Sequence, residues 1–154
     1  KEELENYLLK RGIDNAELAG MAQGLPGRLI DWLDDEEGLK VYRAETDRFI
    51  HMIGQPFFSK LKSVEDLFGE KGGDTIATRE NLGAVLGLWQ VLARDICTAS
   101  AGLTTEVIHQ VKIVADYKPK DWVVLEKRIS EARVLLNQNI HPRLVVENIL
   151  LSLP

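Results

Sequence analysis

The sequence contains few of the residues on which metal sites and disulfides depend. Among its 154 residues there is one cysteine, Cys97, and there are three histidines, His51, His109 and His141. A single cysteine cannot form an internal disulfide, and we expect a buried structural thiol because Cys97 lies in an apolar helical stretch. No histidine has a second histidine or a cysteine at the spacing of metal ligands. We therefore expect no metal site, and we expect His141 to cap a final helix before Pro142.

Motifs of nucleophilic and phosphate-binding enzymes are also missing. There is no Gly-x-Ser-x-Gly motif, and Cys97 has no histidine near it in the sequence. The segment from Gly69 to Thr75 is superficially like a phosphate-binding loop, but it lacks the Gly-Lys-Ser/Thr core. The acidic run from Asp34 to Glu37 fits a solvated hinge better than a metal loop, in which other residues separate the ligands. We expect no catalytic residues and no cofactor.

Long apolar runs and a positive net charge are absent as well. No run approaches the ~18 residues of a membrane span, and the acidic start of the chain lacks a signal-peptide core. The net charge is −5, so the overall field of the chain repels nucleic acid. The composition fits a reducing compartment, and we expect a cytoplasmic protein. The chain begins without Met and inside a helical pattern, which suggests a piece of a longer protein.

Apolar residues recur at helical spacing along nearly the whole chain, and alternating strand-like runs are absent. Gly12, Gly24 and Pro26 mark the ends and starts of three short helices at the N-terminus. The acidic run that follows predicts a boundary between two modules, residues 1–35 and residues 36–154. The fold class that we expect is all-α, with a short three-helix module followed by a bundle of five or six helices.

Apolar stripes predict where the helices of the second module lie. One helix ends at Gly54, and the next begins at Pro56 with Phe57, Leu61, Val64 and Phe68 as its stripe. A long helix from about Thr78 to Ser100 has apolar residues on more than one side, so we expect it to be buried on several faces. Further stripes predict helices through Val107 to Ala115, through Trp122 to Leu136, and from Pro142 onward.

The last predicted helix has an unusual pattern. From Leu144 to Leu153, seven of ten residues are aliphatic, and they cover most of the circumference. A helix that is apolar nearly all round is buried on several sides. Either this helix is the central core helix of a monomer, or its spare face contacts a partner subunit.

Arg28 lies in the first turn of the third predicted helix, after Pro26 and Gly27. A cation in that position opposes the helix dipole, so local stability does not favour it. Arg28 therefore has two interpretations. It can aim at an anion that approaches the helix N-terminus, or it can be an exposed arginine beside a carboxylate such as that of Asp31.

Three segments together resemble a known family. The run from Ala22 to Leu29, with its Gly-x-Pro-Gly-Arg pattern after two short helices, resembles the lid of clamp-loader subunits of the bacterial DNA polymerase III holoenzyme. The segment from Ala132 to Leu151, with its Asn-x-Asn and leucine-rich end, is similar to the close of their collar domain. The segment from Leu88 to Asp95 resembles their long middle collar helix. Among these AAA+ subunits, delta-prime is the most similar and gamma/tau the second.

The resemblance implies an AAA+ lid over residues 1–35 and an oligomerisation collar over residues 36–154. In this family the collars pack side by side into a ring, and the loader places a sliding clamp on primer–template DNA by using ATP. The implied partners are the other loader subunits, gamma/tau and delta. The sliding clamp and DNA are reached only through the whole complex, and no membrane is involved.

The resemblance also implies roles for particular residues. Arg28 occupies the lid-arginine position, which approaches nucleotide held by an ATPase core that this chain lacks. The expected subunit interface is the last helix, through five aliphatic residues: Leu144, Val145, Ile149, Leu150 and Leu153. The fragment itself would be a non-catalytic assembly piece without a cofactor.

Two other hypotheses remain. The chain can be a free-standing helical adaptor that holds a partner helix on the face from Leu144 to Leu153. It can also be a small all-α enzyme or ligand-binding protein with an apolar pocket between helices, where polar groups converge.

Overall fold

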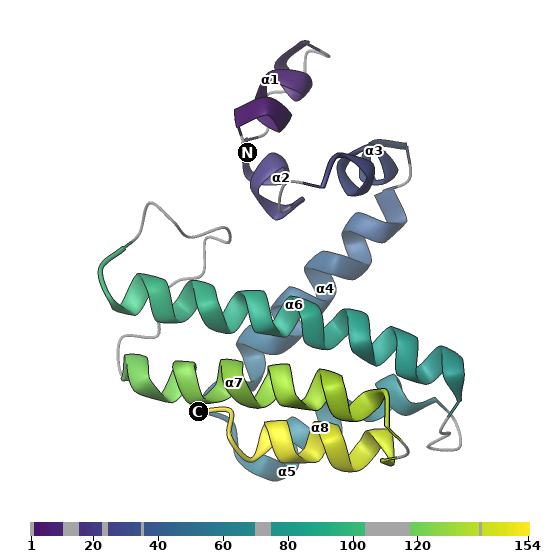
Figure 1. The fold of residues 1–154 in the computed structure, drawn as a ribbon, viewed down its shortest axis with the longest axis vertical. Coiled ribbons are helices and arrows are strands. Elements are labelled where there is room, and N and C mark those ends of the chain that lie inside the picture. Colours follow the sequence, from purple (N-terminus) through teal and green to yellow (C-terminus); the bar gives the residue numbers. More distant parts are fainter. Residues whose placement is uncertain are drawn as a thin grey trace.

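The computed structural model describes residues 2–10, 16–22, 25–34, 36–69, 75–103, 118–138 and 140–154, and within these ranges it contains helices and no strand (Figure 1). This confirms the expected all-α fold, with three short helices followed by a bundle. The helices are α1 (Glu2–Lys10), α2 (Ala16–Met21), α3 (Pro26–Asp34), α4 (Glu36–Met52), α5 (Phe57–Ser63), the 3-10 helix η1 (Glu65–Phe68), α6 (Ile76–Ser100), α7 (Pro119–Leu136) and α8 (Pro142–Leu150).

Several helix ends lie where proline and glycine predict them. Pro26 and Pro142 are the first residues of α3 and α8, where the missing N–H of proline has no helical partner to lose. Gly54 follows α4 with a φ of 77°, a backbone conformation that glycine adopts without a Cβ clash. The chain can therefore turn sharply into α5.

One predicted helix is wrong. The stripe from Phe57 to Phe68 belongs to two helices, because the chain leaves the α-helical conformation at Val64, where φ is −112° and ψ is 3°. The tighter 3-10 turn that follows buries Leu67 as well as Phe68, whereas Phe57 is exposed.

Part of the predicted pattern lies outside the described residues. This applies to Gly12 and Gly24, to the helix predicted through Val107 to Ala115, to His109, and to the glycine pair of the loop after Gly69.

The long helix α6 is the centre of the bundle. It packs against α4, α7, α8 and η1, and α7 lies alongside it in Figure 1. Its buried apolar residues include Leu82, Leu86, Trp89 and Ile96, and also Leu88 on another side of the helix. The prediction that this helix is buried on several faces is confirmed.

By length and composition alone, α6 is also apolar enough to cross a membrane. More than half of its most apolar window is buried against the other helices of the bundle. Burial in a bundle accounts for the apolar character of α6.

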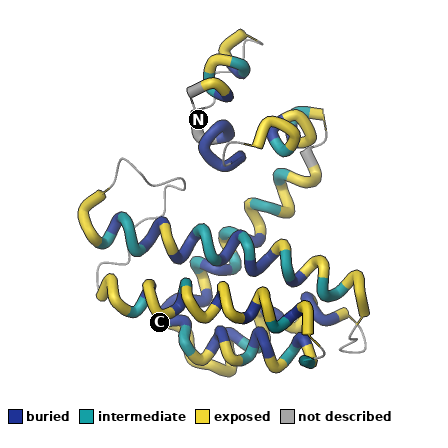
Figure 2. Tube along the Cα trace, in the orientation of Figure 1, coloured by how far each residue is buried: buried dark blue, intermediate teal, exposed yellow. Residues whose placement is uncertain are grey.

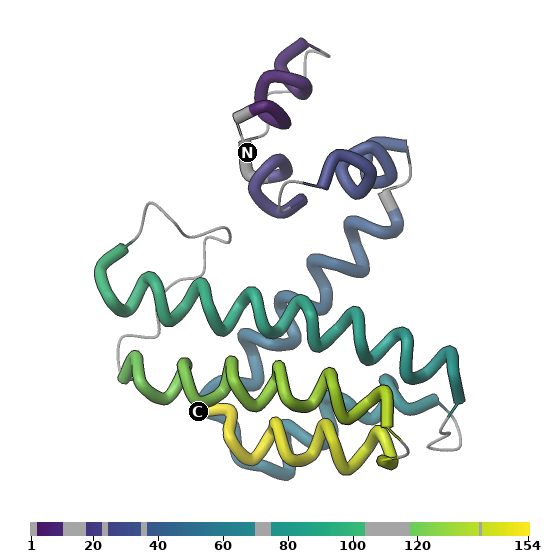
Figure 3. The backbone as a smooth tube through the Cα atoms, viewed as in Figure 1, coloured from purple at the N-terminus to yellow at the C-terminus, as the bar shows by residue number. Residues whose placement is uncertain are grey.

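The described residues form two separate buried clusters. The larger cluster fills the bundle of α4 to α8, and the smaller one joins α1, α2 and α3 through residues such as Leu8, Leu29 and Trp32. Figure 2 shows buried residues in both parts, and Figure 3 shows α4 leading from one part into the other. Tyr42 on α4 contacts both clusters, and its ring meets the Trp32 ring edge-on at 4.9 Å between centroids. The separation lies next to the predicted boundary at residue 35, and independent folding of the two parts stays a prediction.

The central position of α6 can be tested with the Leu86→Ala variant. Leu86 is fully buried, so its truncation should lower the free energy of unfolding by about 2–5 kcal/mol. The matched variant Val124→Ala, at an exposed position of α7, should change it by no more than about 0.5 kcal/mol. Urea denaturation followed by tryptophan fluorescence measures both, and equal losses would contradict the placement of Leu86 in the core.

Candidate interaction site

Most of the residues of α8 that were predicted to form a subunit interface are buried in the core of the chain. Val145, Ile149, Leu150 and Leu153 all lie in the core of the chain's own bundle. The reason is that α5, α6 and α7 each pack against α8 and together cover several of its sides. Of the five residues predicted as an interface, only Leu144 is exposed, at 61%, and their role as an interface stays a prediction.

The outward side of α8 nevertheless carries large aliphatic side chains. Leu144 and Leu151 are 61% and 70% exposed, and the exposed Asn148 lies between them at helical spacing. These three residues, called here the outer stripe, share one face of the helix because they are four and three residues apart. The sequence-based choice omitted Leu151, although its spacing of seven residues from Leu144 places both on one side.

Helix α7 borders the outer stripe. Arg128 of α7 donates a hydrogen bond from Nη1 to Oδ1 of Asn148 at 3.1 Å. Val124 lies one helical turn before Arg128 and is exposed. The outer stripe therefore adjoins a guanidinium and a further aliphatic side chain, a mixture of apolar and polar groups that suits contact with another protein.

Both ends of α8 are held in place. His141 caps its N-terminus by accepting a hydrogen bond at Nδ1 from the backbone N–H of Arg143 at 3.3 Å, as the sequence predicts. Beyond the other end, the buried ammonium of Lys60 donates to the backbone oxygens of Leu153 at 2.6 Å and Pro154 at 3.2 Å. The backbone N–H of Gly54 also donates to Pro154 at 2.9 Å.

Burial lowers the pKa of the Lys60 ammonium, since removal from water disfavours the charged form. Sequence analysis missed this residue because nothing in its local pattern distinguishes a buried lysine from an exposed one. The contacts of His141, Lys60 and Gly54 hold both ends of α8, so the helix that carries the outer stripe is fixed in place.

Arg28 lies in the first turn of α3, as expected, and is partly exposed. Its guanidinium carbon is 6.0 Å from the centroid of the Trp32 ring, one helical turn further along. A guanidinium at this distance is attracted to the negative face of the ring. Within the described part of the chain, this ring is the contact found for Arg28, rather than the carboxylate of Asp31 that one interpretation favoured.

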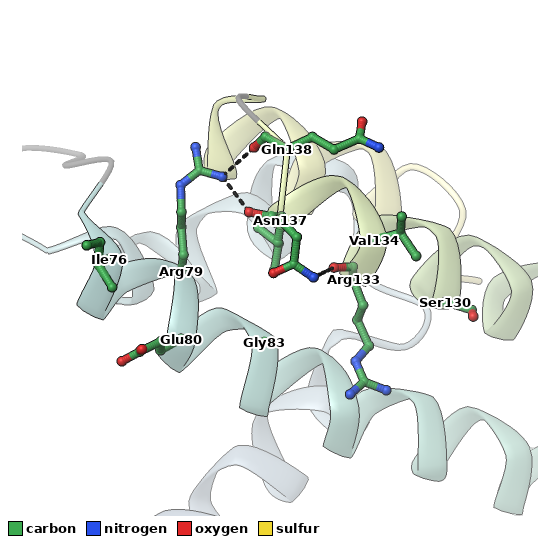
Figure 4. A pocket seen from close by; sticks show the side chains of 10 residues that line it. Ile76, Arg79, Glu80, Gly83, Ser130, Arg133, Val134, Asn137 and Gln138 are labelled. Atoms are coloured by element: carbon green, nitrogen blue, oxygen red, sulfur yellow. Dashed lines mark hydrogen bonds between the residues drawn. The ribbon is translucent and has the colours of Figure 1, made fainter.

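An open groove of about 800 Å³ lies between the N-terminal part of α6 and the C-terminal part of α7 (Figure 4). Arg79 projects from α6 into this region and donates hydrogen bonds to the backbone oxygens of Leu136, Gln138 and Ile140 at 2.5, 2.8 and 2.9 Å. The last carbonyls of a helix have no partner within it and carry partial negative charge. Arg79 therefore caps the end of α7, which is a structural role.

The second arginine of the groove is also engaged. Arg133 passes Gly87 of α6, where an added Cβ would lie 3.7 Å from the guanidinium carbon. It donates to Oε1 of Gln90 at 2.9 Å, and Gln90 in turn donates to Oε1 of Glu126 at 2.6 Å. This chain of hydrogen bonds ties α6 to α7.

A buried carboxylate joins three elements of the bundle. Glu45 on α4 accepts a hydrogen bond from Nε1 of Trp89 on α6 at 2.8 Å, and its other oxygen is 3.3 Å from Nε of Arg48. Arg48 also binds both carboxylate oxygens of Asp66 in η1, at 2.9 and 2.6 Å. Burial raises the pKa of Glu45, although Arg48 and the Trp89 hydrogen bond oppose this shift.

The described residues contain no group of three or more His, Cys, Asp or Glu side chains that could hold a metal ion. Cys97 is only partly buried, against the expectation of a buried thiol, and its Sγ lies 3.7 Å from the backbone oxygen of Pro119. The contacts described above are those of packing and capping.

The Glu45→Gln variant tests the buried carboxylate. Because folding raises the pKa of Glu45, the folded chain holds this proton more tightly than the unfolded chain. The contribution of Glu45 to stability is fully present below its ordinary pKa of 4.5 and is lost as pH rises through the raised value. Relative to Glu45→Gln, the wild-type free energy of unfolding should therefore fall as pH rises from about 4 through the raised pKa of Glu45. Denaturation of both proteins across this range measures it, and a constant difference would refute the shift.

Comparisons with known proteins found no matching family model, no similar curated protein and no similar solved structure. The similarity to clamp-loader subunits therefore stands on the short sequence segments in which it is seen. The physical basis for a functional proposal is the arrangement of helices and the outer stripe.

Proposed function

We propose that this chain is a non-catalytic assembly module of a bacterial DNA polymerase III clamp loader, most like the lid and collar of delta-prime. The observation that carries the proposal is the outer stripe. Leu144 and Leu151 are largely exposed on a helix whose other apolar residues fill the core. Exposed leucines that share one face of a fixed helix favour a docking surface for another subunit.

The order of the helices supports the same proposal. Three short helices with their own small core precede a bundle built around one long helix. A lid followed by a collar has this order in the family that the sequence segments resemble. The long helix α6 contains the segment from Leu88 to Asp95 that is similar to the middle collar helix.

The charge of the chain favours protein partners. With a net charge of −5, direct binding to the DNA backbone is disfavoured. The proposed partners are the gamma/tau and delta subunits, and the sliding clamp and primer–template DNA are reached through the assembled loader. Arg28 would approach nucleotide only in the presence of an ATPase core.

The outer stripe is small for a stable interface by itself. Stable protein–protein interfaces bury about 1,200–2,000 Å² in total, which exceeds what a few side chains of one helix supply. We therefore expect the isolated chain to be a monomer and to associate where several loader subunits contact one another. Contacts that are weak singly become strong together once the subunits are joined in one complex.

A free-standing adaptor that binds a partner helix is the second candidate, and the same outer stripe favours it. The two candidates differ in the protein that binds. Capture of the gamma/tau and delta subunits supports the loader module, whereas binding to an unrelated helical protein supports the adaptor.

The double variant Leu144→Glu/Leu151→Glu tests the proposal with purified gamma/tau and delta subunits. Both positions are exposed, so the fold should remain within about 1 kcal/mol of wild-type stability. Association, measured by size-exclusion chromatography and by pull-down, should weaken at least about ten-fold because two carboxylates replace apolar contacts.

Two further variants make the result decisive. Val134→Glu places the same charge on an exposed position of α7 outside the outer stripe and should leave association unchanged. Ile149→Glu places it in the core and should unfold the chain. Unchanged association of the double variant, or an equal loss with Val134→Glu, would refute the outer stripe as the interface.

A further inference from the structure

A second cavity lies where the small N-terminal unit meets the bundle, separate from the outer stripe. Its volume is about 430 Å³, within the range of about 300–1,000 Å³ that is usual for pockets of small ligands. Side chains from α3, α4, α6 and α7 line it. Neither the capping role of Arg79 nor the proposed subunit contact accounts for this cavity.

Apolar and polar side chains share the walls of the cavity. The apolar part of the lining includes Val85 and Leu88 of α6, Trp32 of α3 and Val41 of α4. Val41 is 62% exposed. Gly38 and Gly87 also line the cavity, and their lack of side chains leaves it open. This part of the lining suits an apolar ligand body.

The charged groups of the cavity favour an anion. Arg28 and Arg133 both line it, and so does Glu45. The two oxygens of Glu45 are already used, one by Trp89 and one by Arg48, and Arg48 also binds the carboxylate of Asp66. The cations in the lining of the cavity are therefore Arg28 and Arg133.

Arg28 is the group best placed to bind such an anion. A guanidinium has five N–H donors, and the contact found for Arg28 in the described part of the chain is the Trp32 ring. Contact with a ring face leaves the in-plane N–H donors available for a carboxylate. Arg28 also lies in the first turn of α3, where a bound anion would be stabilised by the helix dipole that disfavours the cation.

We propose that this cavity binds a small organic acid, with its carboxylate on Arg28 and its apolar body between Val41 and Leu88. The size of the cavity and the apolar part of its lining favour a monocarboxylate of this kind over a highly charged ligand. Because Arg28 belongs to the small unit and Leu88 to the bundle, the ligand would join the two parts and stabilise their contact. The inference does not depend on the clamp-loader proposal.

The experiment is a titration of the ¹⁵N-labelled 154-residue chain with hexanoate and with 3-phenylpropionate, followed by NMR. Saturable shifts are expected at the Trp32 indole N–H and at the backbone amides of Gly38 and Gly87. The neutral amide 3-phenylpropionamide has the same body without the charge, and it should bind at least about ten-fold more weakly. Failure of both acids to give saturable shifts at these positions would overturn the proposal, as would equal affinity for the acid and its amide.

Matched variants separate the cavity from general charge effects. Arg28→Gln should raise the Kd of the acid at least about ten-fold, whereas Arg94→Gln, at an exposed position of α6 that does not line the cavity, should leave it unchanged. Val41→Glu should weaken binding and the exposed control Val123→Glu should not. The dispersion of the NMR spectrum shows that each variant is folded. Equal affinity of Arg28→Gln and wild type would refute the role of Arg28.

Discussion

Helix α6 carries apolar side chains on several of its sides, and they must be removed from water for the chain to fold. No single neighbouring helix can cover them, so α4, α7, α8 and η1 pack around it. Polar contacts then fix this arrangement in register. Trp89 binds the buried Glu45 of α4, and Gln90 joins Arg133 and Glu126 of α7. Arg79 at the start of α6 holds the end of α7. The positions of α4, α7, α8 and η1 follow from the need to cover α6.

The same constraint decides which residues remain available for function. Because α8 packs against α6, most of its aliphatic residues are buried in the core. The aliphatic residues that remain exposed on α8 are those of the outer stripe. Lys60, Gly54 and His141 then fix this helix at both ends. The small unit of α1 to α3 has its own buried cluster, and the residues of this cluster do not cover α6. It meets the bundle chiefly along α4, and the cavity beside Arg28 lies at that junction.

Sequence reasoning predicted the helices whose ends carry strong local signals, such as α3 at Pro26 and α8 at Pro142. It also predicted the buried stripes of α6 and α7, since helical periodicity depends on local spacing alone. It did not predict the break at Val64, which depends on how Leu67 and Phe68 pack against distant residues. Nor could it assign the residues of α8 to core or surface, because an almost uniformly aliphatic helix does not indicate which sides will be covered. Long-range partners such as Lys60 with Leu153 leave no local pattern.

We expect the packing around α6 to be the most stable part of the bundle and α1 to α3 to open more easily, because the cluster that joins them buries fewer residues. Native-state hydrogen exchange tests it residue by residue, since slow amides report the opening of the most stable unit. The amides of Leu86 and Leu92 in α6 and of Ile129 in α7 should exchange only through global unfolding, with the highest free energies of opening. The amides of Leu8 and Leu29 should exchange through a lower-energy opening that leaves the bundle folded. Equal protection of Leu8, Leu29 and Leu86 would mean that the chain unfolds as one unit, and would contradict this account.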